Sequence, residues 1–400
     1  MKIALFHNPG AGNRTLDASR LLRHFAEGGY DVMYAVTNQK GWESIFRNSF
    51  DRAVIAGGDG TVSRVAPWLA ARNIPFCILP LGTANNCAKT LGQTHAVEVV
   101  VANLGSAGTK KVDLGVVTTP LGHRVFIESL GIGLLAQFMA EMRMLEKKKS
   151  SRDRLTAAER LTGALKYLRL LAKEYPESFC ELLLDDKPLA GNFLLLEAAN
   201  MGLIGPNLNL IPHVNPGDGS FEVVWIGTNQ RKEWREYLKD LQDGVESTPP
   251  IHTTRCHQIV FRHVDAPAHI DGKVFVTMIT PTFVRNQTGA LDLVVIGEGE
   301  RQGASRTTNH QSLFTFHLSP LPPLHIHLRS SGRTRSAMPR GASPKREREY
   351  KKIEKELEKE GRYKGREKEV AARIVNKQRA KAGETKKAPS TKTKTSKRKN

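Results

Sequence analysis

Residues 53–64 read AVIAGGDGTVSR, in which a short apolar run meets three glycines and an aspartate before a second apolar pattern begins. The run RAVIA (52–56) is typical of a buried strand, and TVSRVAPWLAARN (61–73) has the apolar spacing of a helix. A strand that passes through a glycine-rich turn directly into a helix favours phosphate binding, because the exposed amides and the helix dipole attract an anion. The glycines also remove the side chains that would keep a phosphate away from the backbone.

Asp59 lies inside this turn and needs a separate explanation, since a carboxylate repels a phosphate. A divalent cation could bridge the two anions, or the carboxylate could accept or donate a proton. A third interpretation is a helix-capping aspartate in an ordinary glycine turn. This stretch alone does not decide between the three.

Two further turns have the same character. NPGAGN (8–13) follows the apolar run KIALFHN, and LPLGTANN (79–86) follows FCILPL. In a parallel sheet all three turns emerge at the carboxyl ends of the strands, where they can converge on one ligand. Packing alone is a poor explanation for three such turns, so the sequence predicts a nucleotide or phosphate site at this edge.

The chain is expected to be an α/β protein with two structural regions. Residues 1–107 alternate short apolar runs with helical patterns, which predicts a Rossmann-like parallel α/β nucleotide-binding domain. Residues 108–300 contain closely spaced strand patterns separated by turn signals, which predicts a β-rich, antiparallel, sandwich-like second domain. A helical pattern at 157–173 interrupts these strands.

This helical pattern places Leu161, Leu165, Leu168 and Leu171 on one face, with basic residues close by. A basic amphipathic helix can lie on an anionic membrane surface. The same leucines can instead pack against the β-rich domain. Both interpretations stay open at the level of the sequence.

Four cysteines (Cys77, Cys87, Cys180 and Cys256) lie far apart and have no metal-binding spacing, which is typical of reduced thiols. No apolar run approaches the ~18 residues of a membrane span. The first apolar stretch is too short for a signal peptide and is better explained as a buried strand. We therefore expect a cytoplasmic, peripherally membrane-associated protein.

Four histidines (His252, His257, His263 and His269) fall on both faces of predicted strands. No carboxylates recur beside them with metal-ligand spacing, so we expect surface histidines.

The formal net charge of +20 is distributed unevenly along the chain. Residues 337–400 hold 23 Lys and Arg against 9 Glu, and residues 301–336 hold five Arg and no acid. Residues 1–300 therefore carry a net charge of only about +1. The basic character belongs to the carboxyl-terminal part of the chain and not to the predicted globular part.

This carboxyl-terminal part divides by composition into three segments. Residues 301–344 lose all periodicity and are predicted to be a linker. Residues 345–383 are expected to form a small basic helical module, and 384–400 a disordered Lys-rich tail. Such a charge favours nucleic acid or anionic lipid headgroups, while a purely solubilising tail remains the alternative.

The motifs NPGAG, GGDGT and LPLGTANNCAKTLG, in this order and at these spacings, resemble the catalytic domain of diacylglycerol kinases, bacterial lipid kinases and sphingosine kinases. The resemblance covers roughly residues 1–300. It continues in NPGDGSFEVVWI (215–226) and HIDGKVF (269–275). The basic segment with EVAARIVNKQRAKAGETK (369–386) more loosely resembles a plasmid-stabilisation-like module of poorly defined function.

The lipid-kinase resemblance implies an ATP- and Mg²⁺-dependent kinase of lipid and phospholipid metabolism that phosphorylates a lipid with a free hydroxyl, such as diacylglycerol. It implies catalytic roles for Asp59 and for Asp271, the latter as general base on the lipid hydroxyl. Asp218 falls in a region where some relatives hold a structural cation, and an ordinary turn aspartate is the alternative there. The implied nucleotide-binding residues are Asn8, Gly12, Gly57, Gly58, Asp59, Gly60, Thr61, Gly82, Thr83 and Asn85.

The sequence departs from the usual family pattern in three places, one of which is a pair of residues. Lys273 replaces an acid in the DGE segment, Asn86 replaces an aspartate, and Ser63-Arg64 replaces an Asn-Glu pair. Lys273 could bind phosphate or mark a different acceptor. One alternative is therefore a catalytically degenerate homologue that acts as a nucleic-acid-associated protein through its basic tail.

An NAD kinase-like enzyme is the other alternative, because that family resembles this one at GGDGT. NPGAG and LPLGTAN argue against it. The oligomeric state stays open, with a homodimer as one possibility.

Overall fold

Four parallel strands form the first part of a large sheet: β1 (Lys2–His7), β2 (Asp31–Val36), β3 (Arg52–Gly57) and β4 (Phe76–Pro80). Their order is β2-β1-β3-β4. The residues of β1, β3 and β4 are almost all buried, as expected for strands that are covered on both faces. The parallel α/β region predicted from the alternating sequence pattern is therefore present.

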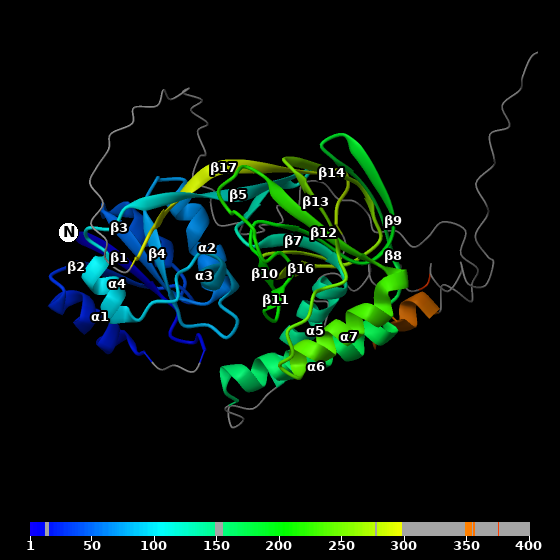
Figure 1. Ribbon diagram of the computed structural model, residues 1–400, viewed down its shortest axis with the longest axis horizontal. Coiled ribbons are helices and arrows are strands. Elements are labelled where there is room, and N and C mark those ends of the chain that lie inside the picture. The colour runs from blue at the N-terminus through cyan, green and yellow to red at the C-terminus, as the bar shows by residue number, and fades with distance from the viewer. Residues whose placement is uncertain are drawn as a thin grey trace, which may run out of the picture. The chain divides into compact units, whose positions relative to one another are not determined.

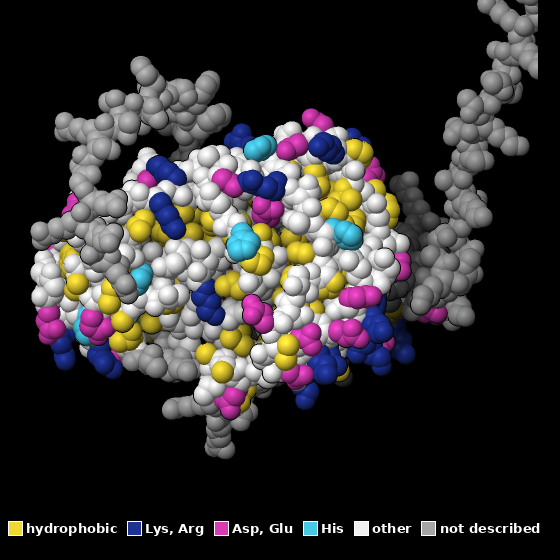
Figure 2. Space-filling model, viewed as in Figure 1, with side chains coloured by type: hydrophobic (Ala, Val, Ile, Leu, Met, Phe, Trp, Pro, Cys, Tyr) yellow, Lys and Arg dark blue, Asp and Glu magenta, His cyan; other side chains and the backbone are white. Residues whose placement is uncertain are grey.

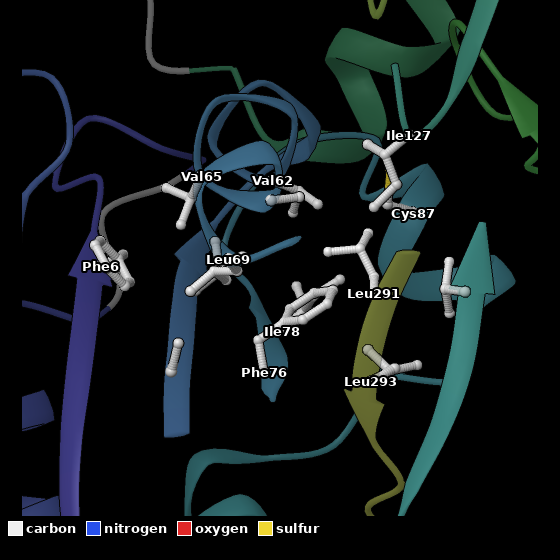
Figure 3. Packing of buried hydrophobic residues seen from close by; sticks show 14 of the residues in the cluster. Phe6, Val62, Val65, Leu69, Phe76, Ile78, Cys87, Ile127, Leu291 and Leu293 are labelled. Carbon is white, nitrogen blue, oxygen red and sulfur yellow. The ribbon is translucent and has the colours of Figure 1, made fainter. Parts of the chain in front are cut away.

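Helices cover both faces of these strands. On one face lie α1 (Ala18–Glu27) and α4 (Val97–Asn103), and on the other lie α2 (Asp59–Ala70), α3 (Asn86–Thr90) and the 3₁₀ helix η1 (Trp42–Arg47). Figure 3 shows Val62, Val65 and Leu69 of α2 over the side chains of the sheet. The helical spacing seen in TVSRVAPWLAARN thus reflects burial of one helix face.

The second region is built from antiparallel strands. They are β5 (Thr109–Thr119), β6 (Gly122–Phe126), β7 (Ser129–Gly133), β8 (Ser178–Leu184), β9 (Lys187–Ala199), β12 (Phe221–Gly227), β13 (His252–Cys256), β14 (Gln258–Val264), β15 (Ala268–Ile270), β16 (Lys273–Phe275) and β17 (Thr282–Val294), with β10 (Leu203–Ile204) and β11 (Leu208–Asn209) as a separate pair. Long β9 pairs with β8 through its first half and with β7 and β12 through its second. The β-rich prediction is confirmed.

Strand β17 joins the two regions. Its first four residues pair with β14, and residues along most of its length pair with β5. Near its end, Leu293 lies opposite Phe76 in the parallel strand β4. Figure 3 shows Leu291 and Leu293 beside Phe76 and Ile78 in the core under α2. The predicted boundary at 107/108 therefore falls within one continuous sheet, and the described residues up to 297 form a single unit (Figure 1).

Three helices accompany the antiparallel strands: α5 (Leu134–Lys148), α6 (Ala157–Glu174) and α7 (Arg231–Gln242). Only α6 was predicted, and it begins with a capping box in which Thr156 and Glu159 exchange hydrogen bonds. Leu165 and Leu168 of α6 are buried in one cluster with Trp234 of α7, so the protein itself covers this leucine face. Figure 2 shows charges of both signs gathered over α6 and α7.

The computed structural model describes residues 1–12, 16–148, 155–276, 278–297, 349–353, 355–356 and 375. The predicted linker at 301–344 and tail at 384–400 lie outside the described residues, as does most of the basic module at 345–383. Those assignments therefore stay predictions. Within the described residues, no helix combines the length and apolarity that a bilayer crossing requires.

Candidate active site

The three glycine-rich turns meet through their backbones. A Cβ built on Gly12, whose φ is +53°, would lie 2.1 Å from the carbonyl oxygen of Leu81. A Cβ on Gly82 would lie 2.5 Å from the Cα of Gly58, and one on Gly58 would lie 2.9 Å from the Cα of Gly82. Real Cβ atoms do not approach this closely, so these three glycines allow the first, second and third turns to touch. The structure thus brings together the turns that the sequence analysis singled out.

The remaining glycines of GGDGT have different surroundings. A Cβ on Gly57 would lie 2.4 Å from the hydroxyl oxygen of Thr61, so Gly57 is needed for the turn to fold back on its own helix. A Cβ on Gly60 would meet no atom of the described residues within 4 Å. Gly60 is also exposed, at the second position of α2. No protein contact explains Gly60, and the open space beside its Cα leaves room for a ligand.

Asparagine side chains fix the shape of two turns. Asn85 adopts a left-handed conformation with φ of 55°, and its side chain accepts from the Gly82 amide at 2.8 Å and donates to the Gly82 carbonyl at 3.0 Å. Asn8 accepts from the Gly10 amide at 3.1 Å and donates to Thr61 at 3.4 Å. Both residues therefore hold backbone conformations and do not simply project toward a ligand. The neighbouring Thr83 is partly exposed.

Asp59 is the first residue of α2 and links this helix to α3. Its Oδ1 accepts a hydrogen bond from the amide of Cys87 at 2.9 Å. Burial raises the pKa of the Cys87 thiol well above its usual range, and the carboxylates of Asp59, Glu128 and Asp271 raise it further. Three carboxylates therefore lie close enough to one thiol to act on it electrostatically.

Asp271 is held by a row of backbone amides. Its Oδ1 accepts from Glu128 at 2.8 Å and from Ser129 at 3.2 Å, and its Oδ2 accepts from Ile127 at 3.0 Å. Ser63 of α2 supplies a fourth hydrogen bond from its side chain. Burial raises the pKa of Asp271, while these hydrogen bonds oppose the rise. The carboxylate thus has four donors and fixes the chain segment between β6 and β7.

Glu128, which the sequence analysis missed, lies within this segment. Its carboxylate is buried, and its Oε1 accepts from the Asn86 side-chain amide at 2.8 Å. Burial raises the pKa of Glu128 well above its usual range, and the neighbouring charges of Asp59 and Asp271 add to the shift. No described residue donates to Oε2. Figure 3 shows Ile127, the preceding residue, next to Cys87.

Glu128 could have been suspected from the sequence because position 86 holds asparagine in place of the usual aspartate. An amide in place of an expected carboxylate can donate a hydrogen bond, and Asn86 is buried, so it needs an acceptor. Its acceptors are Glu128 Oε1 at 2.8 Å and the carbonyl oxygen of Gly205 at 3.0 Å. The carboxyl group that is usual at position 86 is therefore absent there, and one is present instead at position 128, between β6 and β7.

A second buried acid pairs with a histidine. His269 Nε2 lies 2.9 Å from Glu197 Oε1, and both side chains are fully buried. The expectation that His269 is a surface residue was wrong, because β15 turns its side chain toward the interior, against β9. The other three histidines, His252, His257 and His263, are exposed as predicted. The charge of Glu197 also contributes to the raised pKa of Glu128.

Asp218 has a protein cation as its partner. Its Oδ2 pairs with the guanidinium of Arg255, which also lies 3.2 Å from Glu222, and its Oδ1 accepts from the Ser220 amide at 3.1 Å. A guanidinium between the two carboxylates takes the place that a structural cation would need. Within the described residues there is also no group of three or more metal-ligating side chains. The residues around Asp218 do not fit a metal ion.

A hollow of ≈ 600 Å³ lies beside β2 and η1. It is lined by Met33, Tyr34, Ala35, Val36, Gln39, Lys40, Gly41, Trp42, Ser44, Ile45 and Asn48. Its lining extends past the carboxyl end of β2, and Asn38 in that stretch lies 3.9 Å from a Cβ position on Gly10 of the first turn. The hollow is therefore at the same edge of the sheet as the glycine-rich turns.

Comparison with known proteins agrees with this arrangement. Residues 2–117 match the model of the diacylglycerol kinase catalytic domain. Over 231 residues the chain is 26% identical to the diacylglycerol kinase of Bacillus subtilis, which covers 55% of this chain and 72% of that protein. It is 23% identical over 226 residues to a diacylglycerol kinase of Mycobacterium tuberculosis, covering 54% and 67%.

Among solved structures, a diacylglycerol kinase from Bacillus anthracis superposes with a TM-score of 0.53 at 17% identity, covering 73% of this chain and 96% of that one. This likeness shows that the fold extends through both regions of the sheet. Residues 2–117 of this chain therefore match the diacylglycerol kinase catalytic domain, and the chain is similar over more than half of its length to bacterial diacylglycerol kinases.

Proposed function

We propose that this protein transfers the γ-phosphate of ATP to the hydroxyl of a diacylglycerol-like lipid. The observation that carries the proposal is the meeting of three glycine-rich turns with the carboxylates of Asp59, Glu128 and Asp271. Turns of this kind bind phosphates, and carboxylates next to them can position a metal or accept a proton. The match of residues 2–117 to the diacylglycerol kinase catalytic domain supports a kinase that acts on lipids.

On the nucleotide side, the turns would hold the phosphates through backbone amides. Gly60 has open space beside its Cα and lies in the first turn of α2, where unpaired amides and the helix dipole favour an anion. The hollow beside β2 offers room at the same edge for the nucleoside part. We assign Thr83 and Asn85 to the same cradle because the third turn touches Gly58 through Gly82.

Asp59 fits a Mg²⁺ ion that arrives with the nucleotide. Magnesium is commonly held by one or two carboxylates together with substrate phosphates and water, and Asp59 follows directly on the second turn. The ion would offset charge on the phosphate oxygens. The residues around Asp218 take no part in this assignment.

On the acceptor side, we propose that the carboxylate of Glu128 accepts the proton of the lipid hydroxyl. The lipid hydroxyl must lose its proton as it attacks the γ-phosphate, so a carboxylate with a free oxygen is required. Asp271 already accepts four hydrogen bonds, whereas Glu128 accepts one. Asp271 then acts as a positioning residue that holds the 127–129 segment, and Glu128 contacts the reacting hydroxyl.

A bilayer-resident acceptor also requires contact with the membrane surface, so we propose a cytoplasmic enzyme that associates peripherally with membranes. The leucine face of α6 is packed inside the protein and does not supply this contact. The basic carboxyl-terminal segments are the other candidate, since clustered lysines attract anionic headgroups.

The test is a phosphoryl-transfer assay with γ-labelled ATP, Mg²⁺ and a panel of lipids in detergent micelles, separated by thin-layer chromatography. We expect label in a lipid band with the wild-type protein and none with Asp59→Ala. Transfer to NAD in place of lipid would establish the NAD kinase-like alternative. A folded protein that transfers label to neither would support the degenerate, nucleic-acid-associated alternative and overturn the proposal.

A further inference from the structure

Three basic side chains from three different elements gather around β16. The guanidinium of Arg124 in β6 lies 4.9 Å from the ring centroid of Phe275 in β16, the strand that starts at Lys273. The turn before Lys273 faces α5, because a Cβ on Gly272 would lie 3.9 Å from the sulfur of Met139. Arg143 is one helical turn after Met139 on α5, which lies beside β16 (Figure 1).

These three cations have no acidic partner within the described residues. Each is exposed, and none of them forms an ion pair there. Partial burial lowers the pKa of Lys273, and the charges of Arg124 and Arg143 lower it further. Like charges held together by the fold repel one another, so the cluster is best satisfied by an anion from outside the chain.

The cluster is on the acceptor side of the candidate active site. Lys273 is two residues from Asp271, and Arg124 lies in the strand that leads to Glu128. The three basic residues come from β6, α5 and β16, whereas the glycine-rich turns that we assign to the nucleotide all lie within residues 8–85. An anion bound by the cluster is therefore closer in the chain to the proton acceptor than to the phosphate-binding turns.

Exposed apolar side chains accompany the three cations. Val276 follows Phe275 and is 89% exposed, Met144 follows Arg143 and is 63% exposed, and Leu121 in the turn before β6 is 78% exposed. Cations mixed with exposed apolar residues are typical of surfaces that contact lipid headgroups and the upper acyl chains together. A soluble anion alone would not account for the apolar residues.

We propose that the acceptor is an anionic glycerophospholipid that carries a phosphate beside the hydroxyl to be phosphorylated, and that Lys273, Arg124 and Arg143 bind this phosphate. The inference rests on the proposed lipid kinase activity and names its substrate class. Arginine is suited to bidentate phosphate contacts, and lysine supplies a point charge. Lys273, which stands where the family pattern has an acid, then changes the preferred acceptor from a neutral to an anionic lipid.

The reaction on this acceptor is an ordinary phosphoryl transfer. The headgroup hydroxyl oxygen forms a bond to the γ-phosphorus, and the bond between that phosphorus and the β–γ bridging oxygen breaks. The hydroxyl proton passes to Glu128, and ADP leaves with the electron pair of the broken bond. The phosphate already present in the headgroup stays bound to the cluster and takes no part in bond changes.

The experiment compares two acceptors in neutral detergent micelles: phosphatidylglycerol, which has both hydroxyl and phosphate, and diacylglycerol, which lacks the phosphate. We expect the wild type to favour phosphatidylglycerol by about 10-fold or more in kcat/KM, since one charged hydrogen bond contributes about 1.5–3 kcal/mol. Lys273→Glu should raise the KM for phosphatidylglycerol by about 10-fold and leave the KM for ATP unchanged. Lys187→Glu, an equal charge change at an exposed residue of β9, should change neither.

A third arm separates recognition of the acceptor from attraction to any anionic surface. Diacylglycerol is presented together with phosphatidic acid, which supplies phosphate on a different molecule from the hydroxyl. If phosphatidic acid restores diacylglycerol phosphorylation to the rate on phosphatidylglycerol, the cluster binds the surface and the inference is wrong. A preference for diacylglycerol, or a Lys273→Glu effect on the KM for ATP, would also overturn it. Absence of transfer to every lipid would instead overturn the proposed kinase activity.

Discussion

The nucleotide side and the acceptor side of this molecule are held together by different kinds of contact. The turns at 57–61 and 81–85 touch backbone to backbone, at glycines that allow no side chain between them. The acceptor side is held by one side chain, Asp271, which bonds to amides more than 140 residues earlier in the chain. Steric fit at small residues maintains the first arrangement, and a buried charge maintains the second.

On the side that we assign to the acceptor, two acids differ in their hydrogen bonding, and we propose different roles for them. Asp271 has all its acceptor sites used, and Glu128 has one donor and one oxygen without a protein partner. A partly buried carboxylate with a raised pKa, such as that of Asp271, is therefore not necessarily the group that reacts. Substitutions can separate the two roles, because loss of a structural acid lowers stability and loss of a reacting acid lowers turnover.

The largest effect is expected from Asp271→Ala. Three backbone amides would lose their acceptor, and alanine would be strained at the φ of 45° that Asp271 adopts. We expect the free energy of unfolding to fall by about 4 kcal/mol, with loss of activity. Urea denaturation followed by circular dichroism measures this. A change below about 1 kcal/mol would show that Asp271 is not structural.

Glu128→Gln should remove activity and keep the fold. The amide of glutamine has nearly the same shape, so we expect kcat to fall by about 100-fold or more because no carboxylate accepts the hydroxyl proton. The unfolding midpoint should stay at or above the wild-type value, since a buried charge is removed. Full activity in this variant would return the role of general base to Asp271.

On the side that we assign to the nucleotide, two glycine-to-alanine substitutions can likewise separate a structural role from a ligand-binding role. Gly82→Ala would force a Cβ to within 2.5 Å of the Gly58 backbone, and we expect a loss of about 2 kcal/mol in stability. Gly60→Ala has open space and should leave stability within about 0.5 kcal/mol, while it raises the KM for ATP. Equal destabilisation by both alanines would contradict a ligand-facing role for Gly60.

Stability should depend on pH through Glu128. Its pKa in the folded state is raised, so the folded protein binds this proton more tightly than the unfolded chain does. The corresponding stability is present below the ordinary glutamate pKa of about 4.5 and is lost as pH rises through the raised value. Urea midpoints of wild type should therefore decrease relative to those of Glu128→Gln between acidic and neutral pH. Parallel curves for the two proteins would count against this linkage.

The smallest effect is expected at Asp218. Arg255→Ala would break exposed pairs with Asp218 and Glu222, which contribute about 0–1 kcal/mol together. If the arginine replaces a structural cation, a chelator should leave the wild-type unfolding temperature unchanged. A drop in that temperature with EDTA, reversed by Mg²⁺, would show that a metal stabilises this region after all.

The contrast between the two sides also explains what the sequence could predict. The turns at 8–12, 57–61 and 81–85 are contiguous motifs between regular elements, so their convergence follows from strand direction in a parallel sheet. The place of Glu128 in the candidate site depends on contacts with Asn86 and Asp271, which are distant from it in the sequence. Local patterns do not contain such pairings.

Helices α5 and α7 were missed for a related reason. The segment Leu134–Lys148 follows directly on β7 without a cap or turn signal, and Arg231–Gln242 is strongly charged with only a narrow apolar face. Trp234, Tyr237 and Leu238 provide that face, and they are buried against α6. A helix whose identity depends on its packing partner is difficult to recognise in a single sequence.

Strand β17 pairs with strands of both regions of the sheet, and its late position in the chain affects folding during synthesis on the ribosome. Strand β4 pairs with β3 on one side, but its neighbour on the other side is completed only when Leu293 has been synthesised, roughly 200 residues after Phe76. At about 5–20 residues per second, this delay is on the order of 10–40 s. Throughout it, the nascent amino-terminal sheet has an unpaired edge, which is the kind of surface on which chains aggregate. A chaperone that covers β4 during synthesis, or slow synthesis at low temperature, should increase the soluble yield.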